Sequence, residues 1–314
     1  MIQTVTGRIS LIQIKQTLAH EHIVFGKPGV ITDVDNCYQR EEAYQNAIMR
    51  LDMVKKYDVN LIVDPTPMEW GRDVLLMKKL AQKSNVYIVC ATGFFKDEGD
   101  MLAYLKALSY HQDIVETCVK IFRKELEEGI GNTNIKAGII KVASSYACIR
   151  PLEECIFQAA AKVSNKYHVP IFTHCDRGTM ASQQVEIFKQ ENVSPSRVVI
   201  GHMTSNENLD EIRQIMRKGF TVGFDQFGIV SIPGIPSDEE KMQNLLTLLK
   251  EGFENYIVLS HDTIFDRMGY VSSSKPRYPD MIFNMVLPYL RSHGISEDTI
   301  QRITRDNLLK ILEG

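Results

Sequence analysis

The sequence alternates short apolar segments with longer amphipathic segments along its whole length. The apolar segments that read as β-strands are eight, at residues 17–22, 61–64, 86–92, 137–142, 170–174, 198–202, 221–225 and 256–262. Most intervals between consecutive strand ends are near the roughly 30 residues of a βαβ unit. Eight consecutive units of this kind predict an α/β protein whose parallel strands close into a (β/α)8 TIM barrel.

The segments between the strands predict helices. Residues 40–57 and 152–166 repeat apolar residues at three- and four-residue spacing, and Ser237 with Glu240 has the sequence of a capping box. The longest interval contains an extra segment, 97–113, which we expect to form a lid or rim insertion before a helix at 114–128. Residues 1–16 precede the first barrel strand and predict a small hairpin or plug. Because no linker interrupts the pattern, residues 1–314 predict a single domain.

The composition excludes several classes of partner. With 36 Lys+Arg and 39 Asp+Glu the net charge is −3, and no basic run offers a footprint for nucleic acid or an anionic membrane. No apolar segment approaches the roughly 18 residues of a spanning helix, and residues 1–15 lack the order of a signal peptide. The six cysteines show no paired spacing and predict free thiols. We therefore expect a cytoplasmic protein that acts on a small molecule, either as a monomer or as a homodimer.

Residues that can bind metal ions end four of the predicted strands. The first strand ends in a His-Glu-His triplet, in which the two histidines share one face and Glu21 points to the other. The fifth, sixth and eighth strands add further ligands, which gives the set His20, His22, His174, His202 and Asp262. The carboxyl ends of barrel strands converge on one mouth, where active sites of this fold lie. The sequence therefore predicts a shared metal site. His261 faces away from Asp262 in an extended strand, and we expect it to have a structural role.

Lys141 lies in the apolar strand 137–142, where an unpaired ammonium would be costly to bury. An ion pair with an ordinary carboxylate such as Asp64 is one explanation. The other is a lysine carbamate, formed from the neutral amine and carbon dioxide, which is an anion able to bridge two cations. The charge balance beside four histidines and an aspartate favours the carbamate.

These residues resemble those of the phosphotriesterase-related proteins, a family of metal-dependent (β/α)8 barrels within the amidohydrolase superfamily. The resemblance spans nearly the whole chain. Besides Ala19-His-Glu-His22 it rests on Gly71-Arg-Asp73, Ala91-Thr-Gly93, Ile139-Ile-Lys-Val-Ala143, Thr173-His174, Gly201-His-Met203 and Leu259-Ser-His-Asp262. It implies a hydrolase that holds two divalent metal ions, with zinc as the default and cobalt, manganese or iron also accepted.

The resemblance also implies a role for each ligand. His20, His22 and Asp262 are expected to bind the buried ion, His174 and His202 the more exposed ion, and carboxylated Lys141 to bridge the two. Two such ions hold a bridging hydroxide and polarise the substrate oxygen, and Asp262 is expected to carry the proton to the leaving oxygen.

The resemblance to the lactonases of the family is imperfect on the loop after the third strand. They usually carry a Tyr or Trp against the substrate there, whereas this chain has Phe94-Phe95. The missing phenol weakens acyl-homoserine-lactone or paraoxon hydrolysis as the native reaction. Phe95 is expected either to line the substrate pocket or to pack at the rim.

Cations near the last two strands bear on the choice of substrate, because loops there often hold phosphate in barrels. Lys241 lies in the first turn of a predicted helix, where a cation opposes the helix dipole. The loop after the eighth strand adds Lys275, Arg277 and Tyr278. A solvated basic loop is the simple explanation. The functional explanation, which we favour, is a binuclear-metal lactonase that opens a phosphorylated sugar lactone, with these residues binding the phosphate.

Two other functions stay open at this point. One is a lactonase or phosphotriesterase for apolar lactones and organophosphate esters, which a hydrophobic loop after the eighth strand would have favoured. The other is a barrel that binds metal in a regulatory role without turnover. The complete set of metal positions argues against the second.

Overall fold

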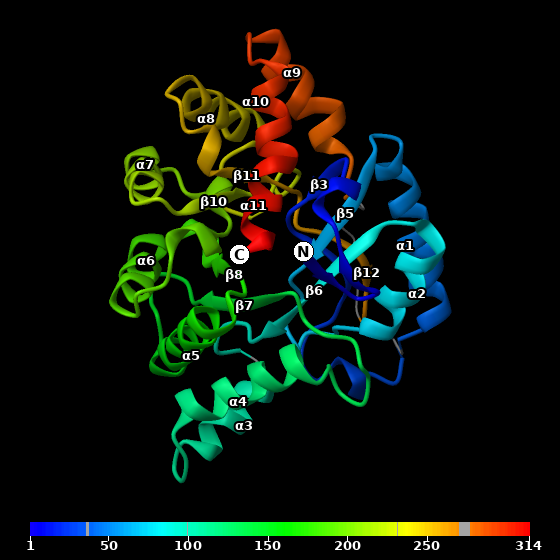
Figure 1. The fold of residues 1–314 in the computed structure, drawn as a ribbon, viewed down its shortest axis with the longest axis vertical. Helices are drawn as coiled ribbons and strands as arrows, with labels where there is room; N and C mark the ends of the chain where they lie inside the picture. Colours follow the sequence, from blue (N-terminus) through cyan, green and yellow to red (C-terminus); the bar gives the residue numbers. More distant parts are fainter. Residues whose placement is uncertain (36–37, 99, 231, 270–276) are drawn as a thin grey trace.

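The computed structural model describes residues 1–35, 38–98, 100–230, 232–269 and 277–314 (Figure 1). Its centre is an eight-stranded sheet, all parallel, in the order β11-β10-β9-β8-β7-β6-β5-β3. These strands are β3 (Gln16–Leu18), β5 (Val59–Asp64), β6 (Tyr87–Gly93), β7 (Ile139–Ser144), β8 (Ile171–Cys175), β9 (Val198–Ile200), β10 (Thr221–Phe224) and β11 (Ile257–Leu259). The two edge strands meet where Ala19 N donates to Leu259 O at 3.3 Å. The sheet is thus a nearly closed barrel, which confirms the predicted architecture.

Helices surround the barrel (Figure 1). They are α1 (Arg40–Lys55), α2 (Val74–Ser84), α3 (Asp100–Leu108), α4 (Ile114–Glu127), α5 (Pro151–Tyr167), α6 (Ala181–Gln190), α7 (Leu209–Arg217), α8 (Asp238–Lys250), α9 (Leu287–Ser292), α10 (Glu297–Gln301) and α11 (Asn307–Glu313). Short 3₁₀ segments are η1 (Leu11–Gln13), η2 (Val30–Thr32), η3 (Asp176–Gly178), η4 (Pro195–Arg197), η5 (Met203–Ser205) and η6 (Glu254–Tyr256), and two π-helical turns are η7 (Ile282–Val286) and η8 (Arg302–Asp306). One buried apolar cluster lies between strands and helices, and a second fills the barrel with side chains such as Leu61, Ile139 and Phe172.

The additions to the barrel agree with the sequence in two places. Residues 1–16 contain an antiparallel hairpin, β1 (Ile2–Thr4) with β2 (Gly7–Ile9), and Val5 N donates to Ile88 O close to the start of β6. The hairpin therefore covers the amino-terminal end of the barrel. The predicted insertion at 97–113 contains α3.

The first predicted strand was too long, because the chain bends at Ala19 and His20. Residues beyond the bend form a separate strand, β4 (Glu21–Phe25). It pairs in parallel with β12 (Thr263–Arg267), a strand that the sequence did not predict. The pair continues the first and last barrel strands beyond the mouth.

No helix within the described residues is long and apolar enough to cross a membrane. The described cysteines are all unpaired, namely Cys90, Cys118, Cys148, Cys155 and Cys175, and Cys37 lies outside the described residues.

Candidate metal centre

The predicted ligands from the first and last strands meet at the carboxyl end of the barrel. His22 Nε2 lies 3.1 Å and His20 Nε2 lies 3.6 Å from Asp262 Oδ1. The three side chains offer ligand atoms that all lie within 4.8 Å of one another, and both histidines are buried. This group has the residue types and the convergence that a divalent metal ion requires.

Two of the ligand residues have a left-handed backbone. His202 follows β9 with φ at 62°, and Asp262 follows β11 with φ at 54°. Residues other than glycine reach this region at a cost of about 1–3 kcal/mol each, so the surrounding structure must hold them there. Asp262 N donates to His20 O at 3.0 Å, which ties the strained turn to the first strand.

Asp225, just beyond β10, fixes the orientation of two ligand rings. Its Oδ2 accepts from His20 Nδ1 at 3.0 Å, and its Oδ1 accepts from both Nδ1 and the backbone N of His202 at 2.9 Å. Both carboxylate oxygens are therefore occupied by donors. Although Asp225 lies within ligand distance of both histidines, this geometry makes it the partner that holds the proton on Nδ1 and leaves Nε2 free for a metal ion.

The hydroxyl of Thr66 orients the His22 ring in the same way, because its Oγ1 lies 2.7 Å from His22 Nδ1 and leaves Nε2 for a metal ion. Sequence analysis ended a strand at Asp225 but gave the residue no role. The available signal was its position, because it is an acidic residue at the same barrel mouth as the ligands.

His174 and His202 form the second half of the centre. His174 Nδ1 and His202 Nε2 lie 2.7 Å apart, and His174 Nε2 is buried without a hydrogen-bond partner among the described residues. Burial, followed by the charge of His202, holds the pKa of His174 well below its ordinary range, and burial lowers the pKa of His20 to about 4. The imidazoles of His174 and His20 are therefore neutral near pH 7, which is the form that binds metals.

Lys141 lies in the barrel with its ammonium nearly without partners. The side chain is 1% exposed, and its Nζ makes one hydrogen bond, to Thr173 O at 3.2 Å. Burial lowers its pKa to about 8. The ion pair with Asp64 is not formed, because Asp64 accepts from the backbone N of Ile23 and of Thr66, both at 2.8 Å. A buried amine with a single hydrogen bond, beside neutral imidazoles, fits the residue set of a binuclear metal centre.

Comparison with known proteins identifies the family of the chain. The model of the phosphotriesterase family matches residues 1–312. The chain belongs to the phosphotriesterase family. It is thus a member of the amidohydrolase superfamily and a metal-dependent hydrolase.

Similar proteins cover almost the whole chain. An aryldialkylphosphatase of Saccharolobus solfataricus is 29% identical over 93% of this chain and 92% of its own length. The organophosphorus hydrolase of Deinococcus radiodurans superposes with a TM-score of 0.95 at 33% identity, covering 99% of this chain and 96% of that one. A mutant of a PTE-like lactonase from the same organism gives the same TM-score and identity, with 99% and 100% covered.

Glu21 and His261 form a hydrogen-bond network that joins the first strand to the last. Glu21 Oε1 accepts from Ser260 Oγ at 2.8 Å and from His261 N and Nδ1 at 3.0 and 2.8 Å, while its Oε2 accepts from Thr263 N at 2.7 Å. His261 Nε2 in turn accepts from Ile282 N at 3.0 Å. Both side chains are fully buried. Their nitrogen and oxygen atoms are used by these contacts between the first and last strands and are not directed at the metal centre.

An aromatic belt, Phe25 with Trp70 and Phe95, borders the ligands. The Phe95 ring lies 4.6 Å from the rings of both His174 and Trp70. Trp70 lies 5.1 Å from Phe25, whose ring is 5.2 Å from that of His22. Phe94, by contrast, is a core residue. Sequence analysis missed Phe25 and Trp70, which nothing local marks except that Trp70 is the only Trp of the chain.

The predicted phosphate-binding residues have other partners where they are described. Lys241 is fully buried, and its Nζ donates to Gln226 O at 2.8 Å, Ile229 O at 2.6 Å and Asp238 Oδ1 at 3.1 Å. This anchoring accounts for a cation in the first turn of α8, which the sequence analysis ascribed to a substrate.

Arg277 lies near the metal centre and binds backbone there. It donates to His261 O at 3.1 Å and to Asp262 O at 2.7 Å. Tyr278 is 45% exposed beside Arg50, and Lys275 lies outside the described residues.

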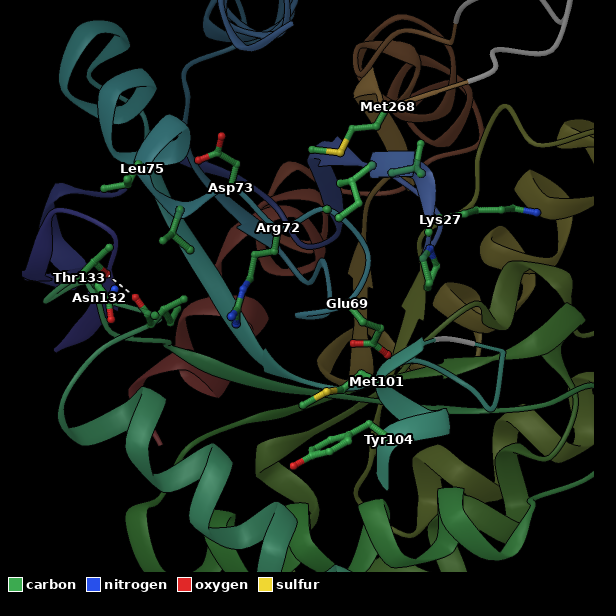
Figure 2. Close-up of a pocket in the computed structure, with 18 residues that line it drawn as sticks. Lys27, Glu69, Arg72, Asp73, Leu75, Met101, Tyr104, Asn132, Thr133 and Met268 are labelled. Carbon is green, nitrogen blue, oxygen red and sulfur yellow. Dashed lines mark hydrogen bonds between the residues drawn. The ribbon is translucent and has the colours of Figure 1, made fainter. Parts of the chain in front are cut away.

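A cavity of about 700 Å³ is lined by the loops after β4 and β5, by α3 and by the segment before β7, and none of the predicted metal ligands lines it (Figure 2). Glu69, on its wall, accepts at Oε1 from Phe95 N at 2.7 Å, which connects the cavity wall to the aromatic belt. Burial raises the pKa of Glu69 to about 7. Arg72 points toward Glu125, with which it forms two hydrogen bonds of 2.7 Å.

Proposed function

We propose that the protein is a binuclear-metal-dependent lactonase for apolar lactones, with a weaker activity towards organophosphate triesters. The observation that carries the proposal is the aromatic belt against His22 and His174. Aromatic side chains with a few placed polar groups are typical of sites for apolar small molecules. The relatives described above, a lactonase and two organophosphate-degrading enzymes by name, support the same substrate class.

The metal centre in this proposal keeps the roles that the family resemblance implies. His20, His22 and Asp262 would hold the buried ion, and His174 and His202 the exposed one. A carbamate on Lys141 would bridge the two ions, for which zinc is the default and cobalt, manganese or iron are alternatives. The ions supply Lewis acidity and a water molecule that ionises near neutral pH.

The chain's own residues supply positioning and proton transfer. Asp262 directs Oδ1 towards the histidines and lies at the mouth with a side chain that is 17% exposed. It is placed to accept a proton from the attacking water and to give it to the leaving oxygen. The belt residues Phe25, Trp70 and Phe95 exclude water from the apolar side of the substrate, which strengthens the electrostatic interactions of the site.

A phosphorylated sugar lactone is less well supported. It needs free cations beside the mouth, and Lys241 and Arg277 have the protein partners given above. Tyr278 is exposed and remains a residue that such a phosphate would contact. A non-catalytic role in metal binding is less well supported too, because Asp262, the proposed proton acceptor, lies beside His20 and His22.

A substrate screen tests the proposal. The metal-loaded protein is assayed by proton release against an apolar γ-lactone, the same lactone with a terminal phosphate, and an aryl dialkyl phosphate. We expect kcat/KM to be highest for the apolar lactone. Phe95→Ala should raise KM for that lactone about tenfold or more, since burial of an aromatic side chain contributes about 1.5–3 kcal/mol. Tyr278→Phe is the matched control and should leave KM unchanged. Preference for the phosphorylated lactone, with an effect of Tyr278→Phe, would reverse the assignment.

A further inference from the structure

Gln226 links the proton acceptor of the metal centre to a neighbouring loop. Its Nε2 donates to Asp262 Oδ2 at 3.0 Å, and its Oε1 accepts from Ser205 Oγ at 2.6 Å. Gln226 is 8% exposed and Ser205 is 3% exposed, so their mutual hydrogen bond is shielded from water. The two oxygens of Asp262 thus have different neighbours, with Oδ1 towards the histidines and Oδ2 towards Gln226.

Chemistry fixes which end of the amide faces Asp262. An ionised carboxylate only accepts hydrogen bonds, so the amide nitrogen must point at Oδ2. The Ser205 hydroxyl then donates to the amide oxygen and completes the chain of hydrogen bonds. A reversed amide would place its oxygen against the carboxylate oxygen.

The backbone of Gln226 is held as firmly as its side chain. The buried ammonium of Lys241 donates to the carbonyl oxygens of Gln226 and Ile229, and Asp238 Oδ1 accepts from Gly228 N at 2.9 Å. These contacts fasten the loop after β10 to the first turn of α8. Both ends of Gln226 are therefore fixed before any substrate binds.

We propose that Gln226, oriented by Ser205 and anchored by Lys241, is a positioning residue that aims Asp262 Oδ1 at the metal centre. Asp262 Oδ1 faces the histidines, and the hydrogen bond from Gln226 to Oδ2 fixes the rotation of the carboxylate about its last torsion from the other side. The inference rests on the metal centre of the proposed function. It also gives Lys241 a role that does not involve substrate.

The first test compares Gln226→Met with Ser84→Ala in protein loaded with cobalt. Methionine keeps the length of glutamine but cannot donate. Ser84 is an equally buried serine at the end of α2, where its hydroxyl donates to Leu80 O at 2.8 Å. We expect Gln226→Met to lower kcat about ten- to hundredfold, the range of one charge-assisted hydrogen bond, with KM changed less than about twofold. The visible absorption of bound cobalt should shift as the Asp262 carboxylate turns. Ser84→Ala should leave both unchanged.

The second test uses the coupling between Ser205 and Gln226. Ser205→Ala should lower kcat in the same direction by a smaller factor, because the amide loses its orientation. In the Gln226→Met background the same substitution should have no further effect, since the interaction is already absent. The proposal would be overturned if the factors by which the two single substitutions lower kcat multiplied in the double variant. It would also be overturned if Gln226→Met left kcat and the cobalt spectrum unchanged. Should Gln226→Met fail to fold, Ser205→Ala alone decides through its cobalt spectrum. The spectrum needs no turnover, so an error in the proposed substrate would leave this test intact.

Discussion

Replacing Asp225 by Asn tests how the metal centre is prepared for its ions. The carboxylate is 2% exposed and accepts from Nδ1 of both His20 and His202. Burial raises the pKa of Asp225, but the charges and hydrogen bonds of His202 and His20 bring it below its ordinary value. Asp225 is thus ionised at any working pH. An asparagine has a single acceptor oxygen, which should face His202 because two donors of that residue point at it.

The amide nitrogen of the asparagine would then face His20 Nδ1. His20 must answer with a lone pair at Nδ1 and carry its proton on Nε2, the atom that points towards Asp262 and the ion. Loss of one such outer partner typically lowers metal affinity about 10–100-fold, or roughly 1.4–2.7 kcal/mol. Asp225→Ala removes the partner of both the His20 and the His202 ring and should lower the metal affinity about 10²–10⁴-fold.

Competition with a chromophoric chelator measures the affinity directly. We expect the metal affinity to fall from wild type to Asp225→Asn and further to Asp225→Ala. Excess metal should restore most of the turnover of Asp225→Asn. Unchanged affinity in Asp225→Asn would refute the tautomer reasoning. So would a loss of turnover with both ions retained.

Four further substitutions follow from the same contacts. Lys141→Ala should be nearly inactive and regain part of its turnover when a short carboxylic acid is added, because the acid would replace the proposed carbamate. Asp262→Asn should keep much of its metal, measured by elemental analysis, yet lose about 10²–10⁴-fold in kcat. Glu21→Ala leaves four buried donors unpaired and should lower the free energy of unfolding of metal-free protein by about 3–5 kcal/mol in urea titrations. The effect of Glu69→Gln on the free energy of unfolding should depend on pH. The raised pKa of Glu69 makes its ionisation destabilising as pH rises from about 4.5 to about 7, so at pH 8 the variant should be more stable by about 3 kcal/mol, and near pH 4.5 equal to wild type.

The barrel, and the convergence of the candidate ligands at its mouth, could be predicted because their signals are local. Each barrel strand is a short apolar run, and a ligand such as His174 closes its own strand. Strand β12 could not be found this way, since Thr-Ile-Phe-Asp-Arg mixes charge into the pattern and gains its order from pairing with β4. The role of Asp225 depends on two partners, of which His20 is about two hundred residues away in sequence.

Lys241 shows where local reasoning gave too much weight to a small effect. A cation in the first turn of a helix is unfavourable by some tenths of a kcal/mol. Three hydrogen bonds from a buried ammonium outweigh that, because hydrogen bonds to charged groups contribute about 1.5–3 kcal/mol each. Two of the three acceptors are carbonyl oxygens, which the sequence does not distinguish. The belt residue Phe25 was missed for a similar reason, since its contacts join separate strands.

The seam between the first and last barrel strands has a consequence for biosynthesis. The amino and carboxyl ends of the chain lie near each other in Figure 1, with Met1 N 3.8 Å from Glu313 Oε1. The ribosome releases His20 and His22 long before it releases Asp262. A truncated chain that ends before Asp262 would therefore lack one of the three proposed ligands of the buried ion. Because the proposed ligands of the buried ion come from both sides of the seam, that ion would bind only after the first and last strands have come together.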